Sequence, residues 1–355
     1  MQPKQTEKVI SSIEKSFIKQ VQKDKRLKSA FLLVHSEMKG IHLNIAEGSM
    51  NPKQPAYMAS VGKIFTSVII SILYENGHLS IDDSITRYLD HELVNNLHVY
   101  KGKDYTKEIK VKHLLNHTSG LYDTFYPLLE KLLVDQDFNM SPQEAITWAK
   151  IHQKPYFPPG KGFKYTNTNY QLLGLIIEKV TGLPFYVAVK QFIYQPLGMM
   201  NSSILHYSEP LDKDTQSFTD FYVNKHNITN HKGYADLAYA GGVVVSTGED
   251  MLKFMKALVT FQLVKKDTLK KMKNDKARYG VGIDYGYGIM QFKTVPLLMP
   301  KIFNAWGHAG ATGAYMFYHP KMDTYIIGTF NDFSYERKGV RFMLIKVINQ
   351  LKKIK

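Results

Sequence analysis

The sequence feature that most constrains the fold is an apolar run at residues 64–73 that begins directly after a lysine, Lys63. A lysine beside buried residues is costly unless its charge is paired or put to use. Ser60 stands three positions earlier, and residues three apart lie on one face of a helix, within reach of each other. We therefore expect a helix from Ser60 to about Asn76, with the serine and the lysine meeting near its first turn.

Short segments of strand-forming composition predict strands at both ends of the chain. Residues 30–36 and 41–48 have the pattern of two strands around a turn, and residues 304–320 and 324–332 that of neighbouring antiparallel strands. The stretch Tyr-Gly-Tyr-Gly at 285–288 has the composition of a glycine-rich bend. The sequence therefore predicts one antiparallel sheet assembled from both ends of the chain.

Helical spacing of apolar residues dominates the middle of the chain. After an amphipathic helix at the N-terminus, helices are predicted at residues 111–117, 141–152 and 169–182, within 239–258 and from about 335 to 351. We therefore expect an α+β fold, in which an antiparallel sheet flanked by helices stands beside a mainly helical region. Residues 1–59 and 241–355 would form the sheet region, and residues 60–240 the helical region.

The Ser60–Lys63 pair has two interpretations. A serine hydroxyl is a weak nucleophile until a base accepts its proton, and a desolvated lysine can serve that end. A helix N-terminus also offers free N–H groups and partial positive charge to a developing oxyanion. The plainer interpretation is a serine N-cap beside a lysine that reaches solvent, since the pattern S-x-x-K is common by chance.

Two further short motifs bear on this choice. Tyr-Thr-Asn at 165–167 stands between a Pro-Pro-Gly turn and a predicted helix, and His-Ala-Gly at 308–310 lies on a predicted strand. Taken singly, Tyr165 would be interpreted as a tyrosine packed in a loop and His308 as a surface histidine on a strand. Together and in this order, the three motifs resemble the serine β-lactamase and penicillin-binding protein superfamily, and in particular its class C β-lactamase-like branch. That branch combines S-x-x-K and Y-x-N with K-T-G or H-x-G.

The resemblance covers roughly residues 30–332 and implies a role for each motif residue. Further segments similar to this branch stand at residues 79–89, 114–123, 196–202 and 240–254. Ser60 would attack a carbonyl and become acylated, and Tyr165 would accept its proton, with the pKa of the phenol lowered by the Lys63 cation. Asn167 would orient Lys63 and hold the amide on the acyl side of the substrate.

The third motif would complete the site, and it contains the clearest departure from class C β-lactamases. The oxyanion would lie between the backbone N–H groups of Ser60 and Ala311, and Gly310 would let its strand approach the substrate closely. Efficient β-lactamases of this branch carry lysine where this chain has His308. Histidine is only partly charged near neutrality, so it would hold a substrate carboxylate more weakly. We therefore expect slow turnover of β-lactams.

The resemblance implies acyl transfer to water on an amide or ester, with no cofactor. The H-x-G form accompanies D-amino-acid peptidases, D,D-carboxypeptidases and esterases. The expected substrate is therefore a small molecule or cell-wall peptide, namely a D-alanyl peptide or a related compound, with β-lactams as acylating ligands. The alternatives are β-lactamase or carboxylesterase activity, and a penicillin- or cell-wall-peptide-binding protein that does not turn its ligand over.

Composition bears on other functions. The absence of cysteine excludes disulfides and cysteine-ligated metals. The formal charge is +15, but the lysines are scattered and only five of the 46 basic residues are arginine, so no nucleic-acid site is expected. His113 and His117 have the spacing of a zinc pair, yet Leu114 replaces the usual glutamate and no third ligand stands out, so no metal is expected. Without a stretch of signal-peptide or transmembrane type, we expect a soluble protein, cytoplasmic as it stands or exported with its signal peptide removed.

Overall fold

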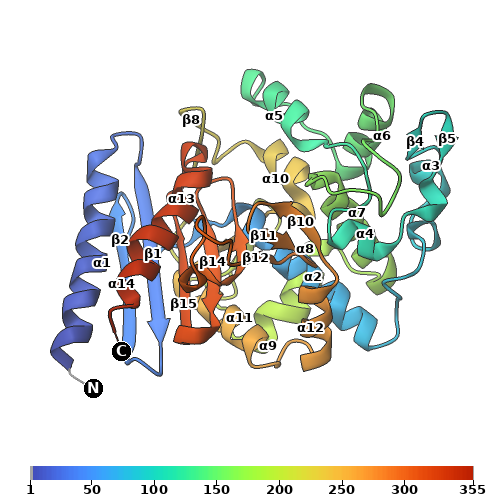
Figure 1. Ribbon diagram of the computed structural model, residues 1–355. Coiled ribbons are helices and arrows are strands. Elements are labelled where there is room, and N and C mark those ends of the chain that lie inside the picture. The colour runs from blue at the N-terminus through green and yellow to red at the C-terminus, as the bar shows by residue number, and fades with distance from the viewer. Residues whose placement is uncertain (1–2, 355) are drawn as a thin grey trace.

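The computed structural model describes residues 3–354, and its centre is an eight-stranded antiparallel sheet (Figure 1). The strand order is β10-β11-β12-β13-β14-β15-β1-β2. Strands β1 (Ser29–Ser36) and β2 (Ile41–Gly48) lie beside β15 (Thr324–Thr329), so distant parts of the chain build one sheet. The predicted α+β class is confirmed, whereas the boundaries proposed for the two regions stay a prediction.

The other strands of this sheet all come from the last third of the chain. They are β10 (Ala277–Gly280), β11 (Ile283–Tyr285), β12 (Met290–Phe292), β13 (Trp306–Ala309) and β14 (Tyr315–His319). Strands β13 and β14 fall inside the range predicted from the sequence, but β10 to β12 were not predicted. The interpretation of residues 285–288 as only a bend is wrong for Tyr285, which ends β11 and pairs with Met290 of β12.

Successive residues of β1 face two different cores, as the two-residue period of a strand requires. Ala30, Leu32 and Val34 belong to the core under α1 (Pro3–Lys23) and the C-terminal helix. That helix consists of α13 (Glu336–Phe342), a π-helical segment (Met343–Ile348) and α14 (Asn349–Leu351). The predicted final helix is therefore present, with a π-helical segment in its middle. Figure 1 shows α1 and α14 side by side over this face of the sheet.

The opposite face of the sheet packs against the buried helix α2 (Gly62–Glu75) and against α11 (Gly248–Val259). Phe31 and Leu33 of β1 belong to this larger core. Phe65 of α2 stacks on Phe254 of α11, with ring centroids 3.8 Å apart. The apolar run that follows Lys63 is therefore the central helix of the molecule.

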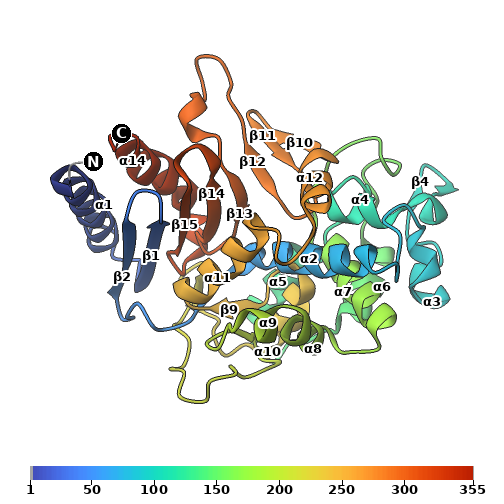
Figure 2. The ribbon, with the colours of Figure 1, turned by 90° about the horizontal axis from the view of Figure 1, so that it is seen from below.

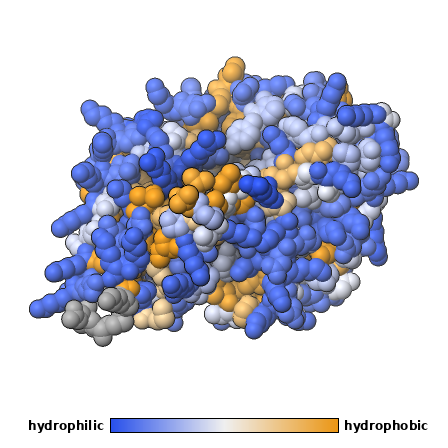
Figure 3. All heavy atoms as spheres, viewed as in Figure 1, coloured by the Kyte–Doolittle hydropathy of each residue, from blue (hydrophilic) through white to orange (hydrophobic). Residues whose placement is uncertain are grey.

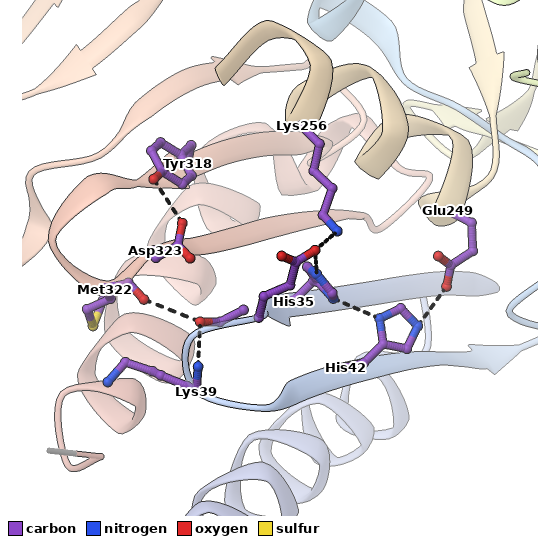
Figure 4. A network of polar contacts seen from close by, with 10 residues as sticks. His35, Lys39, His42, Glu249, Lys256, Tyr318, Met322 and Asp323 are labelled. Atoms are coloured by element: carbon purple, nitrogen blue, oxygen red, sulfur yellow. Dashed lines mark hydrogen bonds and ion pairs between the residues drawn. The ribbon is translucent and has the colours of Figure 1, made fainter. Parts of the chain in front are cut away.

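Polar contacts also fasten α11 to the edge of the sheet (Figure 4). The Nδ1 atoms of His35 on β1 and His42 on β2 lie 3.0 Å apart, and His42 Nε2 lies 3.0 Å from Glu249 Oε1 on α11. About two turns further along α11, Lys256 donates to Glu37 Oε1 at 2.6 Å. These contacts hold the helix against strands from the N-terminal part of the chain.

The helical region joins the far side of α2. Its elements are α3 (His91–Val94), α4 (Val111–Leu115), α5 (Phe125–Val134), α6 (Pro142–His152), α7 (Asn167–Thr181), α8 (Phe185–Val189), α9 (Gln195–Leu197), α10 (Lys232–Ala238) and α12 (Lys266–Asn274). Short strands β3 (Ala56–Tyr57), β9 (Val244–Ser246) and β6 (Ser203–Ile204) form a second sheet. Two small hairpins are β4 (Val99–Tyr100) with β5 (Lys103–Asp104), and β7 (Tyr222–Val223) with β8 (His226–Asn227).

Two helices of this region begin or end as their sequence signals require. The Ser141 hydroxyl accepts from the backbone of Glu144 and the glutamate reaches back to Ser141, which is the capping box predicted for α6. Helix α7 ends at Gly182, whose φ of 69° is the left-handed conformation that favours glycine.

Across residues 3–354, no single helix has the length and apolar composition of a membrane span. The bent helix pair Asn167–Thr181 and Phe185–Leu197 meets that criterion when its two helices are taken together, by length and composition only.

Candidate active site

Lys63 is the centre of the candidate site, and its side chain is fully buried at 0% exposure. Its Nζ atom donates to the carbonyl oxygen of Gly241 at 2.6 Å and to Oδ1 of Asn167 at 2.9 Å, and lies 3.3 Å from Ser60 Oγ. Ser60 sits in a single 3₁₀ turn (Ala59–Val61) that runs directly into α2. The serine and the lysine therefore meet, and the solvent-reaching lysine of the plainer interpretation is excluded.

Burial changes the protonation of this lysine. It lowers the pKa of Lys63 from 10.5 to about 7, and the nearby carboxylate of Asp123 opposes the shift only in part. Its three close partners are all neutral oxygens, which accept hydrogen bonds but carry no full negative charge. At neutral pH, a large fraction of the molecules therefore has an uncharged amine 3.3 Å from the Ser60 hydroxyl.

Tyr165 lies against the same two groups. The Lys63 ammonium nitrogen lies 5.0 Å from the centre of the Tyr165 ring. Burial raises the pKa of Tyr165 well above its usual value of 10, and the hydrogen bond with Ser60 offsets this only in part. The expected lowering of this pKa by the lysine is therefore wrong, because loss of solvation is the larger effect at this position.

Asp123, which sequence reasoning did not select, fixes the orientation of Asn167. Its Oδ1 accepts from the backbone N–H of Asn167 at 2.6 Å and from Nδ2 of the same side chain at 3.2 Å. With the amide nitrogen held in this way, the amide oxygen faces Lys63. Asp123 ends the segment 114–123, so a signal for it was present in that segment's resemblance to the class C branch.

Two glycines allow three chain segments to converge on Ser60. A Cβ atom on Gly310 would lie 2.8 Å from both Ala59 Cβ and the Met58 carbonyl oxygen, and one on Gly242 would lie 2.9 Å from the Ala59 carbonyl. Ala59 itself has a φ of 48°, an uncommon conformation for a residue with a side chain. The missing side chain of Gly310 thus makes room for the turn before Ser60, whereas the sequence suggested room for substrate.

Ala311 follows at the end of β13 and lines the same cavity as Ser60. The backbone N–H of the preceding Gly310 donates to the carbonyl oxygen of Ala314 at 2.8 Å, which holds the turn in place. Ser60 and Ala311 are thus on opposite sides of the close contact that Gly310 permits. The oxyanion site between their N–H groups stays a prediction.

His308 is placed differently from the substrate-binding role expected for it. Its side chain is fully buried, with Nε2 2.8 Å from the Tyr285 hydroxyl and Nδ1 2.6 Å from the Ala309 carbonyl oxygen. Burial, together with the nearby Lys63, lowers the pKa of His308 to about 3. The imidazole is therefore neutral at physiological pH and has both nitrogens engaged by the protein. A partly charged histidine that faces a substrate carboxylate does not fit this structure.

The two histidines with zinc-like spacing serve other contacts. His113 Nδ1 accepts from the backbone of Lys110 at 3.2 Å within α4. His117 lies beyond the end of that helix with a φ of 58°, and its ring centroid is 4.3 Å from that of Tyr165. Its Nδ1 accepts from Nδ2 of Asn169 at 2.9 Å. The pair does not share a helical face, and His117 instead supports the Tyr165 ring.

The convergence of these groups opens onto a cleft of about 920 Å³. Ser60, Tyr165 and Asn167 line it together with Gly310 and Ala311. The charged residues in its lining are Lys164, Glu336, Arg337 and Arg341. Five of the seven residues selected from the sequence therefore line one cavity. The other two, Lys63 and His308, do not line it but each contacts a residue that does.

This fold, with a buried S-x-x-K pair, a Y-x-N motif and a glycine-containing strand end around one cleft, defines a class of protein: the serine hydrolases of the β-lactamase type, which work by acyl transfer. The chain belongs to the Beta-lactamase family, whose sequence model matches residues 16–350. No single activity follows from this membership, because a fold of this kind hosts several.

Comparison with known proteins gives both sequence and structural relatives. The chain is 29% identical to penicillin-binding protein 4* of Bacillus subtilis (strain 168) over 270 residues, which is 70% of this chain and 56% of that protein. It thus spans little more than half the length of that relative. The structure is similar to D-amino acid amidase from Ochrobactrum anthropi SV3 in complex with D-phenylalanine, with a TM-score of 0.79, 20% identity, and coverage of 98% of this chain and 100% of that one. It is also similar to EstCE1, described as a hydrolase with promiscuous acyltransferase activity, with a TM-score of 0.77, 17% identity, and coverage of 98% and 99%.

Proposed function

We propose that this protein is a serine hydrolase that forms an acyl-enzyme at Ser60 on an amide or ester substrate, a D-alanyl peptide or a related D-amino-acid derivative. The observation that carries the proposal is the buried amine of Lys63, with a pKa of about 7, at 3.3 Å from the Ser60 hydroxyl. A neutral amine at that position can accept the proton that makes serine a poor nucleophile.

The acylation step assigns different roles to the lysine and the tyrosine. Ser60 Oγ bonds to the substrate carbonyl carbon while its proton passes to Lys63 Nζ. The carbon–nitrogen or carbon–oxygen bond to the leaving group then breaks, and that group takes up the proton. Because burial keeps the Tyr165 phenol protonated, its hydroxyl acts as a relay beside Ser60. This replaces the role of initial proton acceptor expected from the sequence.

Deacylation uses the same groups in the opposite order. A water molecule gives a proton to Lys63 and bonds to the acyl carbon, the bond to Ser60 Oγ breaks, and the serine recovers its proton. In both steps the negative charge on the carbonyl oxygen is stabilised by the N–H groups of Ser60 and Ala311. Asn167 keeps the lysine amine aimed at Ser60 by accepting one of its protons at 2.9 Å.

The substrate class rests on the chemistry of the relatives and of the cleft. The O. anthropi relative is named as a D-amino acid amidase, and the B. subtilis relative as a penicillin-binding protein. The neutral, enclosed His308 supplies no cation beside Gly310. Slow β-lactam turnover is therefore part of the proposal.

The decisive experiment compares the wild type with Ser60→Ala on four probes: p-nitrophenyl acetate, the p-nitroanilides of D-alanine and of L-alanine, and a fluorescent penicillin. The matched control is Ser71→Ala, because Ser71 is a buried serine of the adjoining helix α2 that donates to the Ser67 carbonyl within the helix at 2.7 Å and does not line the cleft. We expect turnover and labelling in the wild type and the control, with the L-alanine anilide poorer than the D form, and neither signal in Ser60→Ala.

Two results would contradict the proposal. Ester or anilide turnover that survives in Ser60→Ala would place the chemistry elsewhere. Labelling of Ser60 by penicillin with no turnover of any ester or amide would instead identify a binding protein. Intact-mass measurement separates the two, since a stable acyl adduct adds the mass of the acyl group to the wild type.

A further inference from the structure

We propose that the catalytic cleft continues into an apolar arm that binds a long hydrophobic chain of the substrate. This inference rests on the proposed function and deepens it by naming a substrate class. Two strands and the loop at 293–305 form one side of the arm. The side chains that line it there are Ile283, Met290, Phe292, Leu298, Met299 and Phe303.

The second side of the arm is the C-terminal helix. Val340, Leu344 and Ile345 line the same cleft from this helix. The π-helical segment (Met343–Ile348) begins between the first and the other two, and it keeps positions 340, 344 and 345 on the cleft side. Figure 3 shows hydrophobic side chains gathered on this face, over α13 and strands β11 and β12. A cleft wall of this kind binds apolar rather than charged groups.

The charged residues of the cleft come from the C-terminal helix and from the segment before Tyr165. Glu336, Arg337 and Arg341 are near the start of that helix, where Arg341 directly follows Val340, and Lys164 adjoins Tyr165. Every lining residue contributed by β11, β12 and the loop at 293–305 is apolar. A substrate chain would therefore meet only hydrocarbon on the sheet side of the arm, and apolar side chains together with Arg341 on the helix side.

The loop at 293–305 is built to present apolar side chains at the mouth of the arm. Figure 2 shows it standing out from the sheet between β12 and β13. Val295 and Met299 exchange two backbone hydrogen bonds, of 2.9 and 2.8 Å, which close the loop into a tight turn. At its tip Leu297 is fully exposed and Leu298 is 75% exposed. Neighbouring leucines left in water beside an apolar cleft are typical of a surface that binds hydrophobic ligands.

The base of this loop is also fixed. Lys293 donates its backbone N–H to the Gly282 carbonyl oxygen at 2.8 Å. A Cβ atom on Gly282 would lie 2.9 Å from a methyl carbon of Val295 and 3.1 Å from the sulfur of Met299. The loop thus packs closely on the turn between β10 and β11, and the arm is a formed groove with a held wall.

The occupant is a linear hydrocarbon chain attached to an ester or amide that reacts at Ser60. The chain could belong to the acyl group or to the leaving group, and two substrate series distinguish these. One series is p-nitrophenyl acetate, butyrate, octanoate and decanoate, in which the acyl group grows. The other is methyl, butyl and octyl esters of D-alanine, in which the leaving group grows. All are used below the concentration at which they aggregate.

In the wild type we expect kcat/KM to rise with chain length in one of the two series, by about two- to fourfold per buried methylene. Leu344→Asp places a charge in the arm. In the series that responds to chain length, it should lower the ratio of kcat/KM for the eight-carbon chain to kcat/KM for the shortest chain by at least about tenfold. Val340→Trp, which fills the arm without adding charge, should lower the same ratio. The matched control is Ile151→Asp, because Ile151 is an exposed apolar residue of α6 that does not line the cleft; its ratio should equal that of the wild type.

The inference fails if both series are flat in the wild type while the short esters are turned over in a Ser60-dependent manner. That outcome leaves the proposed function intact, so the two failures are distinguishable. The inference also fails if Ile151→Asp lowers the ratio as much as Leu344→Asp, since the effect of the added charge would then not depend on the arm. Near-ultraviolet circular dichroism of each variant checks that its fold is kept.

Discussion

Replacing Lys63 by methionine should change how the stability of this protein depends on pH. Burial lowers the pKa of Lys63 from 10.5 to about 7, whereas the unfolded chain keeps the higher value. Between these two values the unfolded state binds a proton that the folded state does not. The free energy of unfolding of the wild type therefore rises with pH in this window, by up to about 1.4 kcal/mol per pH unit. From pH 7 to pH 9.5 this contribution sums to about 3 kcal/mol.

Lys63→Met removes the titrating group, so its stability should lack that rise. The variant also loses the hydrogen bonds to Asn167 and Gly241, but this loss is the same at every pH and leaves the slope unchanged. Urea unfolding followed by circular dichroism at pH 7, 8, 9 and 9.5 measures the difference between the two proteins. Lys53→Met, at an exposed position, is the control and should follow the wild type. Parallel pH dependence of the wild type and Lys63→Met would refute the desolvated lysine and, with it, the assigned base.

Three further predictions concern the same cluster. With p-nitrophenyl acetate, kcat/KM should rise about fivefold from pH 6 to pH 7 as Lys63 loses its proton. Asp123→Asn should move the midpoint of this rise to lower pH, because the carboxylate of Asp123 raises the pKa of Lys63. A profile that is flat from pH 5.5 to pH 8 contradicts the scheme. Tyr165→Phe should lower kcat by about 10²- to 10⁴-fold, and an unchanged kcat would remove the proton relay. When the pH falls from 7 to 5, the free energy of unfolding of the wild type should drop by about 2 kcal/mol more than that of His308→Gln. The reason is that His308 has a pKa of about 3 in the folded protein, so only the unfolded chain binds a proton there in this range. Equal drops in urea unfolding would show that His308 titrates normally.

The elements that could be predicted from the sequence are those specified by local signals. The capping box of α6 and the left-handed Gly182 after α7 are both set by residues within one or two turns of the helix end. Strand β1 follows from a continuous apolar run and strand β2 from an alternating one, and a short turn joins them. Strands β10 to β12 have only three or four residues each. Their pairing is decided by neighbours in the sheet more than by their own sequence.

The site could be predicted as a set of residues but not as a set of contacts. Ser60, Lys63 and Asn167 stand in recognisable motifs and do meet. The orientation of His308 depends on Tyr285, which lies 23 positions earlier on a strand that was not predicted. Protonation states were missed for a related reason. They depend on how much surrounding chain excludes water from a group, and that chain comes from distant parts of the sequence.

One physical cause, exclusion of water, prepares both groups beside Ser60. It lowers the pKa of the amine of Lys63 and raises the pKa of the phenol of Tyr165, so both tend to be uncharged near neutral pH. A neutral amine can take the serine proton, whereas a neutral phenol can only pass one on, so the assignment of base and relay follows from burial alone. The same exclusion keeps His308 neutral. A substrate anion would therefore find its positive partner in Lys164, Arg337 or Arg341 of the cleft lining, and not in His308. The apolar arm favours an uncharged, apolar part of the substrate.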